Sequence, residues 1–469
     1  MEKTLRLLID GQLVDGAGTM PVINPATGAA FMRAARADTA QLDAAVAAGR
    51  RAFPAWARHS YAERRAYLER FADGVEARFE EFARLLTMEQ GKPLDQARFE
   101  VGGTVAGLRY FAAQDIAPHV IRDTPEERIT EHRSPLGVVA AITPWNFPLI
   151  LLVVKLGPAL ITGNVVIAKP APSTPLTTLL LGEVAADILP AGVFQTLADA
   201  NDLGGPLSAH AGVAHVSFTG STATGKKVLS STIDTLKRFT LELGGNDAAL
   251  VLDDADVAKI APMIFNAAMV NAGQVCLAAK RVYAPRVLYD DLCKALGDLA
   301  RRAVVGDGME QGSQIGPIQN AAQYAKLVDY LAQAREEGTV VAGGEPLERG
   351  GYFIAPTIVR DLPHDARLVQ EEQFGPVLPL LPYDDLDAAI AAINASEYGL
   401  GGTIWTGDPD RGEQVAALIN SGTVWINRHL DLPFDVPFGG AKQSGIGRQQ
   451  GLEGLLEFTQ AKIINMAKA

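Results

Sequence analysis

Residues 215–245, HVSFTGSTATGKKVLSSTIDTLKRFTLELGG, contain the pattern that decides the fold. The apolar run HVSFTGS is typical of a buried strand, and residues 224–231, which follow its glycine, predict a helix. TLELGG then predicts a second strand that ends at two glycines. A strand, a helix and a further buried strand in this order indicate a parallel βαβ unit.

The same alternation extends in both directions along the chain. Before residue 215, GVVAAITPWNFPL and NVVIAKP predict strands, and residues 176–188 predict a helix. After residue 245, AALVL, RVYAP and GTVWIN predict strands, and residues 261–270 and 321–337 predict helices. Because one hydrophobic core rarely holds all of 469 residues, we expect an α/β fold with two α/β domains.

Three segments flank this alternation. Short apolar runs broken by DG, NP and TG in residues 7–31 predict strands joined by tight turns. Residues 39–111 carry apolar side chains at helical spacing, which predicts a helical layer interrupted near Gly91 and Pro93. Residues 122–133 are polar and predict an excursion from the domain.

Composition and charge narrow the classes of partner. The formal net charge of −12 disfavours nucleic acid and anionic membrane surfaces, where Lys and Arg must neutralise phosphates. Two cysteines cannot form a disulfide framework, and no stretch has the length of a membrane span or a signal-peptide core. The seven histidines lack metal-ligand spacing. We therefore expect a cytoplasmic protein that acts on a small molecule without a catalytic metal or a membrane.

The two cysteines have different surroundings. Cys276 lies in NAGQVCLAAK, where Gly273 permits close backbone approach and small or amide side chains precede the thiol. A thiolate nucleophile needs such a polar and accessible site, although the motif by itself fits a structural cysteine equally well. Cys293 is spaced with leucines on one face of a predicted amphipathic helix, so we expect it to serve only in packing.

Two further residues could assist a thiol. Glu242 stands between leucines at a strand end, where an apolar wall would raise its pKa and make it a general base. A carboxylate in a salt bridge would fit the same position. Asn146 in TPWNFP lies between two prolines that stiffen its loop, so its amide could face an oxyanion or could cap the next helix.

The segment FTGSTATGK is a candidate phosphate loop. Gly220 and Ser221 follow a strand and precede a helix, where backbone N–H groups can receive a phosphate. The spacing matches neither G-x-G-x-x-G nor the Walker pattern, so an ordinary glycine-rich turn remains an alternative.

Taken together, these segments carry a family resemblance. The motifs TPWNFPL, AKPAPSTPLT, SFTGSTATGK, LELGGN, GQVC, EEQFGPV and PFGGAKQSGIGR occur in the order seen in aldehyde dehydrogenases. The chain resembles this superfamily over almost its whole length, and the pair LELGGN and GQVC is highly specific. The resemblance implies the NAD(P)-dependent, hydrolytic type rather than the type that acylates coenzyme A.

The resemblance also implies an architecture. It assigns residues 1–117 and 136–243 to a Rossmann-like NAD(P)-binding domain and residues 244–443 to an α/β catalytic domain. Residues 118–135 and 444–469 would form a small β oligomerisation arm, and such arms imply a homodimer or a homotetramer.

Catalytic roles follow from the same resemblance. Cys276 would attack an aldehyde, and Asn146 with the Cys276 backbone N–H would stabilise the oxyanion. Hydride transfer to NAD(P) would leave a thioester, which water activated by Glu242 would hydrolyse to a carboxylic acid. Lys155 matches a lysine near the water path of family members, and a surface salt bridge is an equally good interpretation.

The cofactor site is likewise implied by resemblance. Gly220 and Ser221 would contact the pyrophosphate, Lys169 the adenosine ribose and Glu372 the nicotinamide ribose. The complete implied set is Trp145, Lys169, Pro170, Ala171, Pro172, Gly220, Ser221, Leu243, Glu372 and Phe374.

Three residues depart from the family pattern. Pro172 stands where many NAD-preferring members carry a glutamate, which opens the site to NADP, although NAD is still favoured. Val275 replaces a polar residue or a cysteine, which suggests an apolar or aromatic substrate. Gln449 replaces an acid, which weakens the argument for a proton relay through Lys155.

Two other functions compete with this hypothesis. The thioester could be transferred to coenzyme A or phosphate, a reaction that does not need the carboxylate of Glu242. A non-catalytic protein could also retain the fold, because a fold does not establish a function. The presence of Cys276, Glu242 and Asn146 together favours hydrolytic oxidation of an aldehyde.

Overall fold

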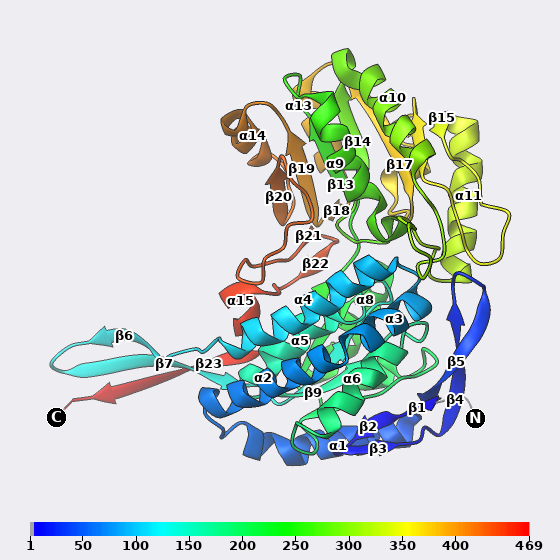
Figure 1. Cartoon of the computed structure of the whole chain (residues 1–469). Coiled ribbons are helices and arrows are strands. Elements are labelled where there is room, and N and C mark those ends of the chain that lie inside the picture. Colours follow the sequence, from blue (N-terminus) through cyan, green and yellow to red (C-terminus); the bar gives the residue numbers. More distant parts are fainter. Residues whose placement is uncertain (1–3, 469) are drawn as a thin grey trace.

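A computed structural model describes residues 4–468, and the first of its two large sheets has eight strands (Figure 1). The strands lie in the order β22 (Gly445–Ile446), β12 (Arg238–Glu242), β11 (His215–Thr219), β8 (Val138–Ile142), β9 (Val165–Lys169), β10 (Phe194–Thr196), β2 (Leu7–Ile9) and β3 (Gln12–Val14). From β12 to β10 the ladder is parallel. Every residue of β8, β9, β10 and β11 is buried, as expected of a parallel sheet.

Helices pack on this sheet in more than one layer. Helices α5 and α6 contact β8–β10, and the helices α2–α4 pack against α5 and α6. The helix bounds are α1 (Thr39–Trp56), α2 (Tyr61–Ala77), α3 (Phe79–Gln90), α4 (Leu94–Ala112), α5 (Ile150–Ile161), α6 (Leu176–Ala186), α7 (Gly204–Ala209), α8 (Thr222–Thr232) and the 3₁₀ turn η1 (Ile233–Thr235).

The second large sheet has seven strands. Its order is β15 (Thr339–Ala342), β16 (Thr357–Arg360), β17 (Val377–Tyr383), β14 (Ala279–Pro285), β13 (Asp247–Val251), β19 (Gly401–Trp405) and β20 (Thr423–Ile426). All neighbouring pairs are parallel except β15 with β16. Its helices are α9 (Val257–Met269), η2 (Val270–Gly273), α10 (Arg286–Arg302), α11 (Ala321–Glu337), α12 (Arg367–Gln370), α13 (Leu386–Asn394) and α14 (Pro409–Ala416).

Smaller sheets complete the molecule. A three-stranded antiparallel sheet projects away from the two large ones (Figure 1) and consists of β6 (His119–Asp123), β7 (Glu127–Pro135) and β23 (Thr459–Ala467). The remaining elements are β1 (Thr4–Leu5), β4 (Gly18–Asn24), β5 (Ala29–Arg36), β18 (Tyr398–Gly399), β21 (Ala441–Lys442) and α15 (Gly451–Leu456). Within segment 444–469, only β23 pairs with the β6–β7 hairpin, because β22 joins the eight-stranded sheet.

The predicted α/β fold class is confirmed, and several element bounds agree closely. Helix α11 covers the predicted residues 321–337. The predicted helical layer of residues 39–111 divides into four helices, with its break at Gly91, whose φ of 100° ends α3. Pro93 then occupies the N-cap of α4, because a proline lacks the N–H that a helix interior requires.

The connection between the two large sheets is short. Glu242 ends β12 in the first sheet, and Asp247 begins β13 in the second, so four residues, 243–246, make this crossing; the chain returns to the first sheet between β20 and β22. Each sheet has its own hydrophobic cluster, and a third, smaller cluster lies around Val275 and Phe438. The crossing therefore places the end of β12 at the junction of the two halves.

Within residues 4–468, no helix is long and apolar enough to cross a membrane. Across the same residues, no group of three or more His, Cys, Asp or Glu side chains could hold a metal ion.

Asn164 ties the first sheet to the segment that precedes β23. Its side chain is fully buried, and Oδ1 accepts hydrogen bonds from the backbone N–H groups of Leu136 (2.7 Å) and Gly137 (3.0 Å). Its Nδ2 donates to the carbonyl of Phe458 (2.9 Å). The Asn164 side chain therefore joins the segment that follows β7 to the segment that precedes β23.

Replacement of Asn164 by Ala is expected to destabilise the protein by about 2–4 kcal/mol, because the buried N–H of Gly137 and the partly buried N–H of Leu136 lose their acceptor. The urea unfolding midpoint measures this loss. Asn266→Ala, on the exposed face of α9, is the matched control and should change the unfolding free energy by no more than about 0.5 kcal/mol. Equal midpoints for the two variants would contradict the role of Asn164.

Candidate active site

A cleft of about 670 Å³ opens where the carboxyl ends of β8, β9 and β11 face the second half of the chain. Crevices at this edge of a doubly wound sheet are the usual ligand sites. Of the fourteen residues predicted for the site, the following eleven line the cleft: Trp145, Asn146, Lys169, Ala171, Pro172, Gly220, Ser221, Leu243, Cys276, Glu372 and Phe374. Pro170, Lys155 and Glu242 are not among its lining residues.

The partly exposed thiol of Cys276 stands between η2 and β14. The turn before it is left-handed, with φ of 52° at Asn271, 54° at Ala272 and 68° at Gly273. A Cβ at Gly273 would meet the carbonyl oxygen of Gly375 at 2.2 Å, so glycine is required there. This geometry brings residues 270–276, called the nucleophile loop because the sequence predicts Cys276 as a nucleophile, against the segment that carries Glu372 and Phe374.

The electrostatic surroundings keep the Cys276 thiol protonated in the free protein. Burial raises its pKa, and the nearby carboxylates of Glu372, Asp247 and Glu242 raise it further. A reacting thiol here therefore needs a group that accepts its proton.

Glu242 is buried at the end of β12, with 3% of its surface exposed. Neither carboxylate oxygen has a hydrogen-bond partner among the described residues, so the salt-bridge alternative is wrong for this structure. Burial raises its pKa to about 8, although the charges of Lys155 and Arg448 act in the opposite direction. A buried carboxylate with this pKa is suited to exchange protons near neutrality.

Lys155 lies on α5 and is fully buried, which rules out the surface salt bridge considered from the sequence. Its Nζ donates a hydrogen bond to Oγ1 of Thr219 at 2.6 Å, and Thr219 lines the cleft. Burial lowers the pKa of Lys155 to about 7, against the opposing influence of Glu242 and Cys276. Lys155, Glu242 and Cys276 are thus close enough to influence one another's protonation.

Asn146 faces the nucleophile loop. Its Nδ2 donates to the backbone carbonyl of Gln274 at 3.0 Å, and the side chain is almost fully buried. The N-cap residue of α5 is Leu149, and the distant carboxylate of Glu100 accepts from the first N–H groups of that helix. The alternative in which Asn146 caps the helix is therefore wrong.

The other end of the cleft has the features of a nucleotide site. Ser221 caps α8, its Oγ accepting from the N–H of Thr224, so the N-terminus of this eleven-residue helix opens at Gly220 and Ser221. Lys169 at the end of β9 forms an ion pair with buried Asp199 at 2.7 Å. The site can therefore receive a phosphate at α8, while the charge of Lys169 is already balanced.

Glu372 and Phe374 close the cleft from the second half of the chain. Glu372 accepts a hydrogen bond from the N–H of Gly245 at 3.0 Å, and a Cβ at Gly244 would meet the Glu372 carboxylate at 2.6 Å. The rings of Trp145 and Phe374 pack edge to face with centroids 5.3 Å apart. Together they form an apolar wall beside the Glu372 carboxylate.

Sequence reasoning missed Asp199 and the residues Gln323 and Lys326. Asp199 follows β10, and the register of β10 with β9 brings it beside Lys169. A polar residue directly after a buried strand was the available signal. Gln323 and Lys326 lie on α11, line the cleft and donate to backbone carbonyls of residues 372–374, which no local motif indicates.

Gln449, one of the departures noted in the sequence, is buried and pairs with Phe438 through backbone hydrogen bonds of 2.7 Å in both directions. Its side-chain Nε2 has no partner among the described residues. The residue thus supplies no carboxylate near Lys155.

Comparisons with known proteins agree with this geometry. The sequence profile of the aldehyde dehydrogenase family matches residues 13–464. The chain is 40% identical over 449 residues to the aldehyde dehydrogenase LUC3 of Fusarium sp, covering 95% of each chain. It is 37% identical over 481 residues to the phenylacetaldehyde dehydrogenase of Pseudomonas fluorescens, covering 98% of this chain and 96% of the relative.

A solved structure shows the same fold. The NAD+ complex of an aldehyde dehydrogenase from Bacillus cereus superposes with a TM-score of 0.97 at 36% identity, covering 99% of this chain and 97% of that chain. The fold, the motif order and the arrangement of the cleft therefore lead to one conclusion: the chain belongs to the aldehyde dehydrogenase family.

Proposed function

We propose that the protein oxidises an apolar aldehyde to a carboxylic acid with NAD, through a thioester on Cys276 that is hydrolysed by water activated by Glu242. The observation that carries this proposal is the unpaired, buried carboxylate of Glu242, with its pKa raised to about 8, whose charge acts on the Cys276 thiol. Glu242 can accept a proton near neutral pH, as a hydrolytic base must.

The first step is addition of the thiol to the aldehyde. The Cys276 sulfur bonds to the carbonyl carbon, and the thiol proton leaves through the cleft for solvent. Asn146 has one Nδ2 hydrogen on the Gln274 carbonyl, and its second hydrogen is free to stabilise the oxyanion with the Cys276 backbone N–H. This assignment explains a buried amide at the edge of the cleft.

The cleft fits NAD through residues of this chain. The α8 N-terminus would receive the pyrophosphate, and the carboxylate of Glu372 and the ring of Phe374 would hold the nicotinamide ribose. The chemistry that bound NAD supplies is acceptance of a hydride. A relative from Bacillus cereus has been solved as its NAD+ complex, which supports the same cofactor here.

Hydrolysis then restores the thiol. Water attacks the thioester carbon as Glu242 takes its proton, the carbon–sulfur bond breaks, and the proton returns to the departing Cys276 sulfur. Lys155, whose pKa is lowered to about 7, can exchange protons with the same region through the hydroxyl of Thr219. Transfer to coenzyme A or phosphate would not use a base, so Glu242 favours hydrolysis.

The wall beside Cys276 favours an apolar aldehyde. Cys276 packs on a cluster that also contains Val275, Phe438 and the partly buried Phe147. Nε2 of nearby His429 donates to the Leu277 carbonyl at 2.6 Å, and burial lowers the pKa of His429 to about 4. The imidazole is therefore neutral at physiological pH. The name of the phenylacetaldehyde dehydrogenase agrees with an aromatic substrate.

We also propose the domain division implied by resemblance, with residues 118–135 and β23 as an oligomerisation arm. The exposed apolar side chains of Ile463, Ile464 and Met466 on β23 support contact with another copy of the chain. The mass of the native protein in solution tests this proposal.

Replacement of Glu242 by Gln is expected to lower the steady-state rate about 10²- to 10⁴-fold, because the thioester forms but is not hydrolysed. Mass spectrometry after mixing with phenylacetaldehyde and NAD should show the acyl group on the peptide of Cys276 and not on that of Cys293. Cys276→Ser is the control and should show no acyl group on either. Undiminished turnover of the Gln variant would remove Glu242 from its proposed role.

The pH dependence of hydrolysis should follow Glu242. Because its pKa is raised to about 8, the carboxylate is mostly protonated at pH 7 and becomes the active base as the pH rises through 8. The decay rate of the acyl-enzyme, followed by rapid quench and mass spectrometry, should therefore rise from pH 6 to 9 with a midpoint near pH 8. A rate that does not change across this range would contradict the assignment.

Cofactor preference should depend on Asp199. Since Asp199 balances the charge of Lys169, the additional phosphate of NADP would find no unpaired positive charge at this residue. We therefore expect NAD to be preferred over NADP. Asp199→Asn should improve NADP relative to NAD about tenfold, because it uncovers the Lys169 charge. The ratio of kcat/KM values and the dissociation constants of 2′,5′-ADP and 5′-AMP measure this change. Unaltered ratios would show that Asp199 has no such effect.

A further inference from the structure

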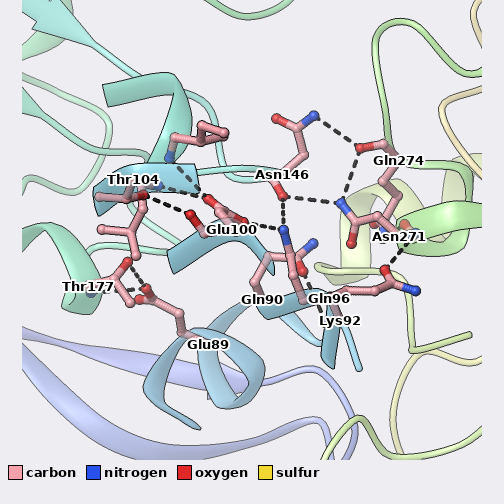
Figure 2. Close-up of polar contacts among 12 residues, drawn as sticks. Glu89, Gln90, Lys92, Gln96, Glu100, Thr104, Asn146, Thr177, Asn271 and Gln274 are labelled. Atoms are coloured by element: carbon pink, nitrogen blue, oxygen red, sulfur yellow. Dashed lines mark hydrogen bonds and ion pairs between the residues drawn. The ribbon is translucent and has the colours of Figure 1, made fainter. Parts of the chain in front are cut away.

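We propose that the buried ion pair between Lys92 and Glu100 is a positioning device, which holds the Asn146 amide in place beside the nucleophile loop. The inference rests on the proposed function, because it assigns these two residues to the step in which Asn146 stabilises an oxyanion. Neither residue lines the cleft, and both act through the backbone that carries Asn146 (Figure 2).

The Lys92 ammonium group contacts the loop of Asn146 and the acid Glu100. The ammonium group forms an ion pair with Glu100 and donates a hydrogen bond to the backbone carbonyl of Asn146 at 2.9 Å. It also lies 3.7 Å from the centroid of the Phe147 ring, a cation–π contact. Lys92 is 1% exposed, so these contacts replace the water that would otherwise solvate its ammonium group. They also restrain residues 146 and 147 at the same time.

Glu100 extends the restraint to the next helix. While its Oε2 binds Lys92, its Oε1 accepts from the backbone N–H groups of Leu149 (2.9 Å) and Ile150 (3.3 Å). The side chain of the N-cap residue of α5 accepts no hydrogen bond from the helix. The Glu100 carboxylate, which comes from α4, accepts from the N–H groups at the start of α5 instead. The loop that holds Asn146 is therefore fixed at residues 146 and 147 and at its junction with α5.

The network continues to the nucleophile loop. Nδ2 of Asn271 donates to the Asn146 carbonyl at 3.1 Å and to the Gln274 carbonyl at 3.3 Å, which also receives the Asn146 amide (Figure 2). The N–H of Asn271 donates to Gln96 of α4 at 3.0 Å. Lys92 and Asn271 thus share one carbonyl oxygen, so any movement of the ammonium group displaces a link between the two loops.

The energetics separate positioning from stability. A buried ion pair is often replaced by neutral residues of similar size with little change in stability, whereas removal of one partner leaves an unpaired buried charge. A displacement of about 1 Å in an oxyanion donor can reduce a rate about 10²-fold. The double variant Lys92→Met/Glu100→Gln is therefore expected to fold and to have a poorly placed Asn146.

Two reagents that react with the Cys276 thiol in the absence of cofactor test this inference. p-Nitrophenyl acetate acylates the thiol through an oxyanion and releases p-nitrophenolate, whereas iodoacetamide alkylates it by displacing iodide at a saturated carbon, with no oxyanion. The double variant should acylate about 10- to 100-fold more slowly than the unaltered protein and should alkylate at an unchanged rate. The NADH burst with an aldehyde should fall by the same factor.

A matched control isolates the contact with Asn146. Glu89 is also a buried carboxylate that serves the start of a distant helix, accepting from the N–H groups of Leu176 (2.7 Å) and Thr177 (3.0 Å). Its side chain has no bond to Asn146, so Glu89→Gln should leave the ratio of acylation to alkylation unchanged. The single variant Glu100→Gln, which keeps the acceptor for α5, should fall between the double variant and the unaltered protein.

The outcomes are distinguishable. Equal acylation rates in the double variant and the unaltered protein would overturn the positioning role and leave the proposed function intact. Parallel losses of acylation and alkylation would also overturn it, because they indicate a general disturbance of the cleft. Failure of the unaltered protein to acylate, while it still alkylates at Cys276, would contradict the proposed function itself.

Discussion

The site depends on the passage of Gly244 and Gly245 between two walls of the cleft. These residues carry the chain from the first sheet to the second, and neither has room for a side chain. A Cβ at Gly245 would meet the carbonyl oxygen of Cys276 at 2.4 Å, and one at Gly244 would meet Glu372. The tight crossing holds the strand end with Glu242, the nucleophile loop and the Glu372 segment together.

Desolvation sets the chemistry of that junction. Burial raises the pKa values of Glu242 and Cys276 and lowers that of Lys155. For Glu242 and Lys155 it outweighs opposing neighbouring charges, whereas for Cys276 the neighbouring carboxylates add to it. The uncharged forms of these groups are consequently well populated at pH 7, which reduces the free-energy cost of burying them together. Groups whose protonation lies near neutrality can exchange protons with modest driving force, which suits a reaction that moves a proton in each half.

The helices beside the cleft are held by distant carboxylates. Leu149 is the N-cap residue of α5 and Pro175 that of α6, and neither side chain accepts a hydrogen bond. Glu100 and Glu89, from α4 and α3, accept from the first N–H groups of these helices instead. The helical layer of residues 39–111 therefore does more than cover the sheet, because it orients the loops at the carboxyl ends of its strands.

The sequence by itself determined the α/β fold class and the position of α11, because hydrophobic periodicity and glycine-rich turns are local signals. That Cys276 and Glu242 act together was predicted only through the family resemblance. The sequence left open whether Asn146 caps a helix and whether Lys155 lies on the surface. Only the tertiary structure decided these points, since helix capping by Glu100 and the burial of Lys155 depend on segments about 50 residues or more away. The ion pair of Lys169 with Asp199 and the hydrogen bond from Lys92 to the Asn146 carbonyl likewise join segments 30 or more residues apart, and no local pattern records which buried charge will meet which partner.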